Sequence, residues 1–167
     1  LHNLGVEYLA VAFADEGVRL REQGITMPIV VLNADGGSYE FMITNRLEPE
    51  IYNITSLMEF MEAVKEMGEA KYPVHIKLDT GMHRLGFDEG GLPEWLSVLA
   101  MDSAHVEVRS VFAHLAAADD PREDIFTLGQ IELFERMSSR IIDSLGYKPL
   151  RHIANSAAVE RFPQARY

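Results

Sequence analysis

The sequence contains no cysteine, so none of its 167 residues can form a disulfide or a thiolate metal site. Basic residues are also scarce: 15 Lys and Arg face 26 Asp and Glu and leave a formal net charge of -11. Such a chain repels phosphate backbones and anionic lipids at long range. These absences exclude a disulfide-stapled fold, argue against nucleic acid and membrane partners, and make the cytoplasm the expected location.

Long apolar runs and several well-known motifs are missing too. No stretch approaches the roughly 20 apolar residues that cross a bilayer. Neither G-x-G-x-x-G nor G-x-x-x-x-G-K-[ST] occurs, so nothing supports a dinucleotide site or a P-loop. G-x-S-x-G and H-E-x-x-H are absent, and the histidines lack metal-ligand spacing, so we expect no metal site. Hydrolysis by paired carboxylates stays open, because the many acids offer pairs of which none stands out.

Apolar runs of strand length recur along the chain, with amphipathic helical stretches between them. These runs cover residues 8–13, 28–32, 49–52, 74–78, 106–114 and 152–154. The clearest helices are expected from near Ser56, where Ser56 and Glu59 have capping-box spacing, and from about Asp124 to Leu145, with Gly146 closing the helix. Strands that alternate with helices are typical of a parallel sheet, so residues 1–167 are expected to form one partial α/β domain.

Six βα units predict an incomplete (β/α)8 barrel of the TIM type, because eight strands close such a barrel. A doubly wound sheet remains an alternative. In barrels of this type, catalytic groups lie at the carboxyl ends of the strands. The polar residues at the predicted strand ends are Asp15, Asn33, Asn53, Asp79, Thr80, His114, Asn155 and Ser156. Taken singly, Asp15, Asn33 and Asn53 are most simply explained as caps or turn residues.

The segment HIKLDTGMHRLGF, residues 75–87, places charges on a strand that should be apolar. Apolar side chains alternate here with His75, Lys77 and Asp79, so one strand face is apolar and the other is ionisable. A lysine between two apolar residues is rarely buried without a partner. Lys77 must therefore reach solvent, contact Asp79 or carry a modified amine. The polar face that leads to Arg84 is a candidate site.

Two further strand ends could contribute to the same place. His114 ends an apolar run and precedes three alanines, although a lone histidine there also fits a buried structural role. Asn155 and Ser156 precede a short helical stretch whose free N–H groups favour an anion, with a plain helix cap as an equal alternative. Together with Arg84, these residues predict a barrel mouth that suits a phosphorylated cofactor.

These motifs resemble those of alanine racemases, the pyridoxal-phosphate-dependent enzymes of fold-type III. The resemblance covers essentially the whole chain, through YLAVAFADEGVRLREQGI, PIVVLN, HIKLDTGMHRLGF, SVFAHLAAADD and RHIANSAAVERFP. It implies a bacterial isomerase, homodimeric when complete, that interconverts L-alanine and D-alanine for peptidoglycan synthesis in the cell wall. In that family an N-terminal barrel holds the pyridoxal 5'-phosphate, and a mostly β domain follows it.

Carried onto matching positions, the resemblance implies roles for five residues. Arg84 would hydrogen-bond the cofactor's phenolic oxygen, and Lys77 would be a carbamylated lysine that orients Arg84. His114 would pack against the pyridine ring, Asn155 would support the Arg84 region, and Ser156 would contact the phosphate. A carbamate beside a guanidinium would also explain a lysine on the ionisable strand face, because such pairs can form two parallel hydrogen bonds.

The resemblance further implies that both catalytic bases lie outside these residues. The family's Schiff-base lysine belongs to a motif like K-A-D-A-Y-G, which does not occur here, and its catalytic tyrosine belongs to the C-terminal β domain. We therefore expect strands two to seven of the barrel, the central portion of that domain, and no activity of the fragment alone. The alternatives are a pyridoxal-phosphate-binding barrel without catalysis and a related serine racemase.

Overall fold

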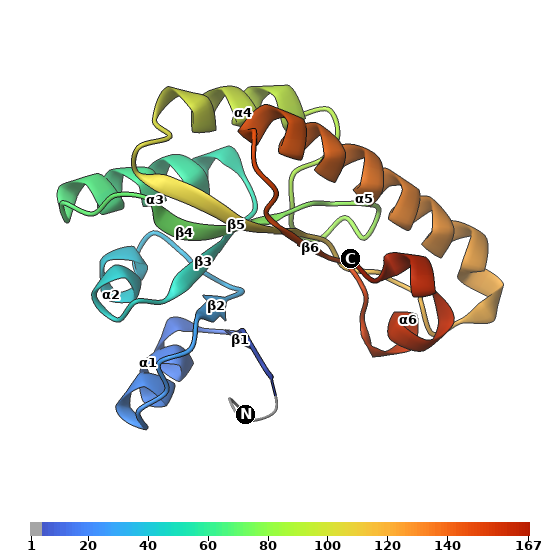
Figure 1. The fold of residues 1–167 in the computed structure, drawn as a ribbon, viewed down its shortest axis with the longest axis horizontal. Helices are drawn as coiled ribbons and strands as arrows, with labels where there is room; N and C mark the ends of the chain where they lie inside the picture. Colours follow the sequence, from blue (N-terminus) through green and yellow to red (C-terminus); the bar gives the residue numbers. More distant parts are fainter. Residues whose placement is uncertain (1–4) are drawn as a thin grey trace.

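The structure, a computed structural model, describes residues 5–167 and consists of one parallel sheet with helices along it (Figure 1). The sheet has six strands in sequence order: β1 (Leu9–Val11), β2 (Ile29–Val31), β3 (Glu48–Ile51), β4 (Tyr72–Lys77), β5 (Val106–Phe112) and β6 (Leu150–His152). A helix follows each strand: α1 (Ala14–Glu22), α2 (Tyr39–Thr44), α3 (Ile54–Glu66), α4 (Leu92–Met101), α5 (Asp124–Leu145) and α6 (Ser156–Arg161).

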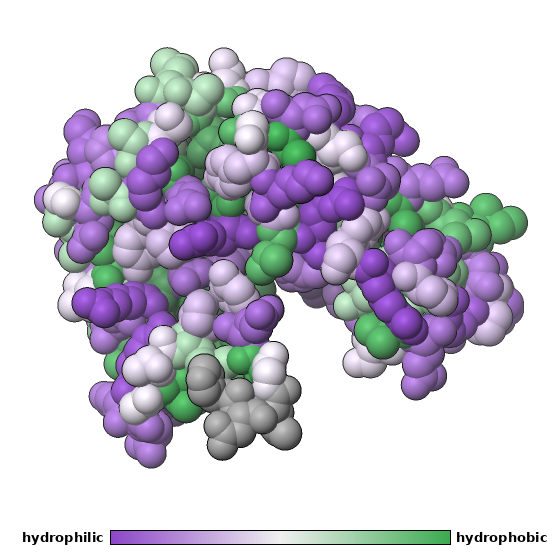
Figure 2. All heavy atoms as spheres, viewed as in Figure 1, coloured by the Kyte–Doolittle hydropathy of each residue, from purple (hydrophilic) through white to green (hydrophobic). Residues whose placement is uncertain are grey.

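The sheet curls into an arc that stays open on one side. Figure 1 shows the larger helices along the outer side of the arc, and the space-filling view shows the gap between its two ends (Figure 2). Strands β1 and β6 form the two edges of the sheet. Strands in sequence order, each followed by a helix, are the arrangement of a barrel, so the predicted incomplete (β/α)8 barrel is confirmed. The alternative prediction, a doubly wound sheet, is wrong, because that fold reverses its strand order at a switch point.

The hydrophobic core lies between the outer face of the sheet and the helices. Successive side chains of a strand point to opposite faces, and in β4 the apolar set that includes Val74 and Ile76 is fully buried. Phe60 of α3, Trp95 of α4 and Phe134 of α5 are also fully buried. The helices therefore cover one face of the sheet. The inner face combines apolar side chains, such as Val30 and Phe112, with the polar side chains of β3 and β4. No helix within residues 5–167 is long and apolar enough to cross a membrane.

The predicted α5 matches the structure, and Gly146 ends it with a φ of 72°. Several other boundaries need correction. Strand β5 ends at Phe112, two residues before the predicted end at His114. Helix α3 begins at Ile54, because Asn53 is its cap: Oδ1 of Asn53 accepts a hydrogen bond from the Ser56 N–H at 2.7 Å. Strand β6 ends at His152, two residues earlier than the predicted strand, since the chain must leave the sheet before Asn155 caps α6.

Candidate active site at the carboxyl ends of the strands

The inner face of the sheet carries two layers of polar side chains. Residues i and i+2 of a strand share a face, so β3 and β4 each contribute two ionisable side chains, one to each layer. The base layer consists of Glu48, His75 and Ser110. The mouth cluster, nearer the carboxyl ends, consists of Glu50, Lys77, Arg84 and His114. The two layers differ in how completely their polar atoms are paired.

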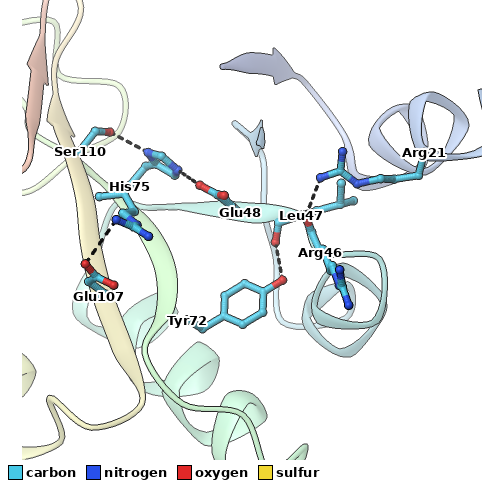
Figure 3. Close-up of polar contacts among 9 residues, drawn as sticks. Arg21, Arg46, Leu47, Glu48, Tyr72, His75, Glu107 and Ser110 are labelled. Atoms are coloured by element: carbon cyan, nitrogen blue, oxygen red, sulfur yellow. Dashed lines mark hydrogen bonds and ion pairs between the residues drawn. The ribbon is translucent and has the colours of Figure 1, made fainter. Parts of the chain in front are cut away.

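The base layer is a continuous chain of hydrogen bonds (Figure 3). Nδ1 of His75 lies 2.7 Å from Oγ of Ser110, and Nε2 lies 2.7 Å from Oε2 of Glu48. His75 and Ser110 are each 2% exposed. Tyr8 packs edge-on against the His75 ring, with centroids 5.7 Å apart. Because both ring nitrogens are bonded and the serine hydroxyl is shielded, this serine, histidine and carboxylate form a structural contact between three strands.

The mouth cluster contains a buried ion pair. Nζ of Lys77 lies 3.8 Å from Oε1 of Glu50, and the two side chains are 11% and 3% exposed. The same nitrogen lies 4.5 Å from the centroid of the Phe112 ring, within range of a cation–π contact. Among the partners considered for Lys77 from the sequence, Asp79 was wrong and Glu50 was missed. Glu50 has a signal in the sequence: in EPEIY, Glu48 and Glu50 share one strand face.

Asp79 instead shapes the loop that carries Arg84. Its Oδ1 accepts hydrogen bonds from the N–H groups of Gly81 at 3.0 Å and His83 at 2.9 Å, and its Oδ2 lies 3.0 Å from Nδ1 of His83. Burial alone would raise the pKa of Asp79, but these bonds outweigh it and the pKa is lowered. The carboxylate therefore holds the loop in one conformation.

The same loop is closed by backbone contacts at its base. The N–H of Asp79 donates to the carbonyl of Phe87 at 2.9 Å, and the N–H of Phe87 donates to the carbonyl of Lys77 at 2.9 Å. Gly86 has a φ of 130°, and a Cβ there would lie 2.5 Å from the backbone nitrogen of Asp79. Only glycine fits this crossing, so the glycine of the RLGF motif fixes the base of the Arg84 loop.

Arg84 projects into a hollow at the strand ends. The hollow has a volume of about 250 Å³ and is lined by Ala12, Leu32, Asn33, Glu50, Lys77, Arg84 and Leu85. Arg84 is exposed there, and within residues 5–167 its guanidinium makes no hydrogen bond or ion pair. The donors of this guanidinium are therefore available to a ligand.

The ionisable groups of the mouth cluster influence one another. Burial raises the pKa of Glu50 to about 7, although Lys77 and Arg84 oppose this shift. Burial lowers the pKa of Lys77, which the Glu50 carboxylate opposes. Burial, followed by the charges of Lys77 and Arg84, lowers the pKa of His114. Burial therefore favours the uncharged imidazole of His114, and the cluster combines three basic side chains with one acid.

Asn155 lies in the loop between β6 and α6, and Ser156 directly follows it. Asn155 caps α6, with Oδ1 accepting from the Ala158 N–H at 3.0 Å, and its Nδ2 donates to the carbonyl of Leu115 at 3.2 Å. Asn155 thereby ties this loop to the residue beside His114. Ser156 is the first residue of α6 and is exposed.

Gln130 of α5 is a second residue that sequence reasoning missed. It is 1% exposed, donates to Oγ1 of Thr80 at 3.3 Å and to the carbonyl of His114 at 3.2 Å, and accepts from the Ala116 N–H at 3.0 Å. One buried amide therefore holds the loop after β4 against the loop after β5. Its place four residues before Phe134, on the apolar side of α5, is the signal that could have found it.

The other predicted strand-end residues have simpler positions. Asp15 is exposed in α1, 3.7 Å from Arg19, and Asn53 is the cap of α3. Asn33 lines the mouth hollow and donates to the carbonyl of Ala12 at 3.2 Å. In the described part of the chain, no three metal-ligating side chains come together. The mouth cluster is the main concentration of chemically active groups that the sequence predicted.

Comparison with known proteins relates this arrangement to one family. Residues 1–167 match the family described as "Alanine racemase, N-terminal domain". Alanine racemase 1 of Oceanobacillus iheyensis is 33% identical over 95% of the chain. The structure of alanine racemase from Clostridium difficile 630 superposes with a TM-score of 0.86 at 33% identity over 96% of the chain, which makes up 44% of that protein.

A more distant structure shares the fold alone. The alanine racemase from Bartonella henselae, with covalently bound pyridoxal phosphate, superposes with a TM-score of 0.78 at 20% identity, over 99% of the chain and 46% of that protein. The chain spans less than half the length of these relatives; the alignment covers 42% of the Oceanobacillus protein.

Proposed function

We propose that this chain, which belongs to the alanine racemase family through its N-terminal domain, holds pyridoxal 5'-phosphate in an enzyme that interconverts L-alanine and D-alanine. The observation that carries the proposal is the mouth cluster, in which Arg84 and Lys77 line a hollow at the carboxyl ends of the strands and their charges act on His114. D-alanine made this way would serve peptidoglycan synthesis.

The residues present fit a phosphorylated pyridine. The unpaired guanidinium of Arg84 within residues 5–167 suits an anionic phenolic oxygen, because a charged donor strengthens such a hydrogen bond. The lowered pKa of His114, caused first by burial, keeps its ring uncharged and suited to stacking on a flat heterocycle. The exposed hydroxyl of Ser156 suits a phosphate oxygen. Pyridoxal phosphate, when bound, supplies an electron sink for the charge left by the departing α-proton.

The chain's own groups would bind and orient. Lys77 and Glu50 lie beside Arg84 in the mouth hollow and set the charge around it. Asp79 holds the Arg84 loop, while Asn155 ties the loop after β6 to the carbonyl of Leu115, next to His114. We propose that the two bases that move the α-proton come from outside these 167 residues, so the chain alone forms no D-alanine. The proposal also includes a homodimer and a cytoplasmic location.

Cofactor binding and turnover by the natural protein test this function. We expect the absorbance of a bound pyridoxal phosphate and formation of D-alanine from L-alanine, faster than the matching reaction of serine. Arg84→Ala should lower cofactor affinity and turnover by more than tenfold, whereas Arg109→Ala, at an exposed position in the middle of β5, should change neither. Cofactor binding without turnover would favour a non-catalytic barrel, and faster turnover of serine would favour a serine racemase.

A further inference from the structure

Glu50 is the feature of the mouth cluster that the resemblance does not account for. Its carboxylate lies 3.8 Å from Nζ of Lys77, is 3% exposed, and lines the same hollow as Arg84. Lys77 is the position at which the resemblance implies a carbamate. That modification would add a carboxylate beside Arg84, and here the carboxyl group of a glutamate already lies beside both Lys77 and Arg84.

The chemistry of carbamylation makes the two arrangements alternatives. A neutral lysine amine attacks the carbon of CO2, a new N–C bond forms, one C–O electron pair moves onto oxygen, and a proton leaves the nitrogen. The product replaces a cation with an anion. A Lys77 carbamate would lie beside the Glu50 carboxylate in a buried site whose one remaining cation is Arg84. Two negative charges so close together repel each other.

We propose that Glu50 takes the place of the carbamate in this protein, and that Lys77 remains an unmodified amine held by Glu50 and Phe112. Burial lowers the pKa of Lys77 and the Glu50 carboxylate opposes that shift, so the reactive neutral amine is less populated than it would be without Glu50. Glu50 is then a positioning residue that sets the charge beside Arg84. The part of this assignment that concerns Arg84 rests on the proposed function.

Glu48 provides a matched control for Glu50. Both glutamates lie on β3 and point inward, but Glu48 bonds to His75 in the base layer, two residues from the Lys77 pair. The substitutions Glu50→Gln and Glu48→Gln both remove one carboxylate and keep the side-chain shape. Only Glu50→Gln deprives Lys77 of its partner, which should lower the pKa of Lys77 and expose a neutral amine to CO2.

The test is ¹³C NMR of the natural protein in ¹³C-bicarbonate buffer, with a Lys77→Met substitution to assign any carbamate signal to Lys77. We expect no carbamate at Lys77 in the unchanged protein or in Glu48→Gln, and a Lys77 carbamate in Glu50→Gln. A carbamate in the unchanged protein would overturn the proposal even if the variants fail to fold. Absence of a carbamate from folded Glu50→Gln would also contradict the role of Glu50.

This readout is independent of the cofactor. A protein without a Lys77 carbamate that also fails to bind pyridoxal phosphate would refute the proposed function and leave the Glu50 inference standing. A protein that binds the cofactor and turns over alanine with Lys77 carbamylated would support the proposed function and refute the Glu50 inference. If both proposals hold, Glu50→Gln supplemented with bicarbonate should recover cofactor affinity, because a carbamate then restores the missing anion.

Discussion

The base layer and the mouth cluster lie two residues apart on the same strands, yet they are paired very differently. In the base layer, His75 bonds to Glu48 and Ser110 at 2.7 Å on both sides. In the mouth cluster, the ion pair of Lys77 spans 3.8 Å, and the guanidinium of Arg84 lacks a bonded partner in residues 5–167. Completed hydrogen bonds stabilise a fold, whereas incompletely paired charges keep the capacity to bind something else.

The largest expected effect is loss of stability from the base layer. His75→Leu would leave the partly buried Glu48 carboxylate and the buried Ser110 hydroxyl without their shared partner, at a cost of about 4 kcal/mol in the free energy of unfolding. His114→Leu in the mouth cluster should cost less than about 1 kcal/mol, because no hydrogen bond of that ring is lost. Urea unfolding of both variants measures the difference. Equal losses of stability in the two variants would show that the hydrogen bonds of the base layer stabilise the fold no more than the mouth cluster does.

The second effect is a pH dependence specific to the mouth cluster. Burial raises the pKa of Glu50 from 4.5 to about 7 in the folded protein, against the opposing charges of Lys77 and Arg84. A carboxyl with a raised folded pKa binds its proton more tightly when folded. Its contribution to stability is therefore full below pH 4.5 and is lost as the pH rises through about 7.

Over that window the stability of the unchanged protein should fall by about 3 kcal/mol relative to Glu50→Gln. Urea unfolding of the unchanged protein and of Glu50→Gln at several pH values measures this. A flat difference between the unchanged protein and Glu50→Gln would mean that Glu50 titrates near its ordinary pKa.

The third effect concerns the loop that carries Arg84. Gly86→Ala would force a Cβ to within 2.5 Å of a backbone nitrogen at a φ of 130° and should cost about 2 kcal/mol. It should also weaken cofactor binding, because the loop base must shift. Gly90→Ala is the control, since its Cβ would meet only Oδ1 of Asp88 at 3.5 Å. Thermal unfolding and cofactor titration of the pair check both statements, and similar behaviour of the two variants would contradict them.

The smallest effect is expected from Gln130→Met, a substitution of similar size. It removes three hydrogen bonds between α5 and the two loops beside the mouth cluster. The two to backbone groups are only partly buried, so water can replace them and the cost is about 1 kcal/mol in the free energy of unfolding. Turnover should fall more than stability suggests, because His114 and Thr80 lose their common support. An activity that follows stability alone would show that Gln130 acts only on the fold.

The fold was largely predictable from the sequence because its signals are local. Alternation and apolar runs identify strands, and the cap chemistry that ends α5 at Gly146 needs only neighbouring residues. The start of α3 was predicted wrongly because Asn53 and Ser56 can both cap a helix, and the choice between them depends on where β3 ends. Boundaries of this kind depend on tertiary structure.

The site was predictable only where its residues lie within one motif. Lys77, Asp79 and Arg84 belong to a single strand and loop, so their pattern could be read along the chain. Glu50 and Gln130 reach the site from other elements. Their importance depends on which strands are neighbours and on which loops α5 packs against, and periodicity states neither. Two signs were available: the charge that recurs with period two in Glu48 and Glu50, and the place of Gln130 four residues before Phe134 on the buried side of α5.

The three hydrogen bonds of Gln130 also determine how the site can move. Because one side chain holds Thr80, His114 and Ala116, the loops after β4 and β5 cannot open independently of the long helix α5. A displacement of either loop must then be shared by the other and by the helix. Hydrogen exchange in the two loops should accordingly occur in one opening event, so the mouth of this barrel moves as a coupled unit.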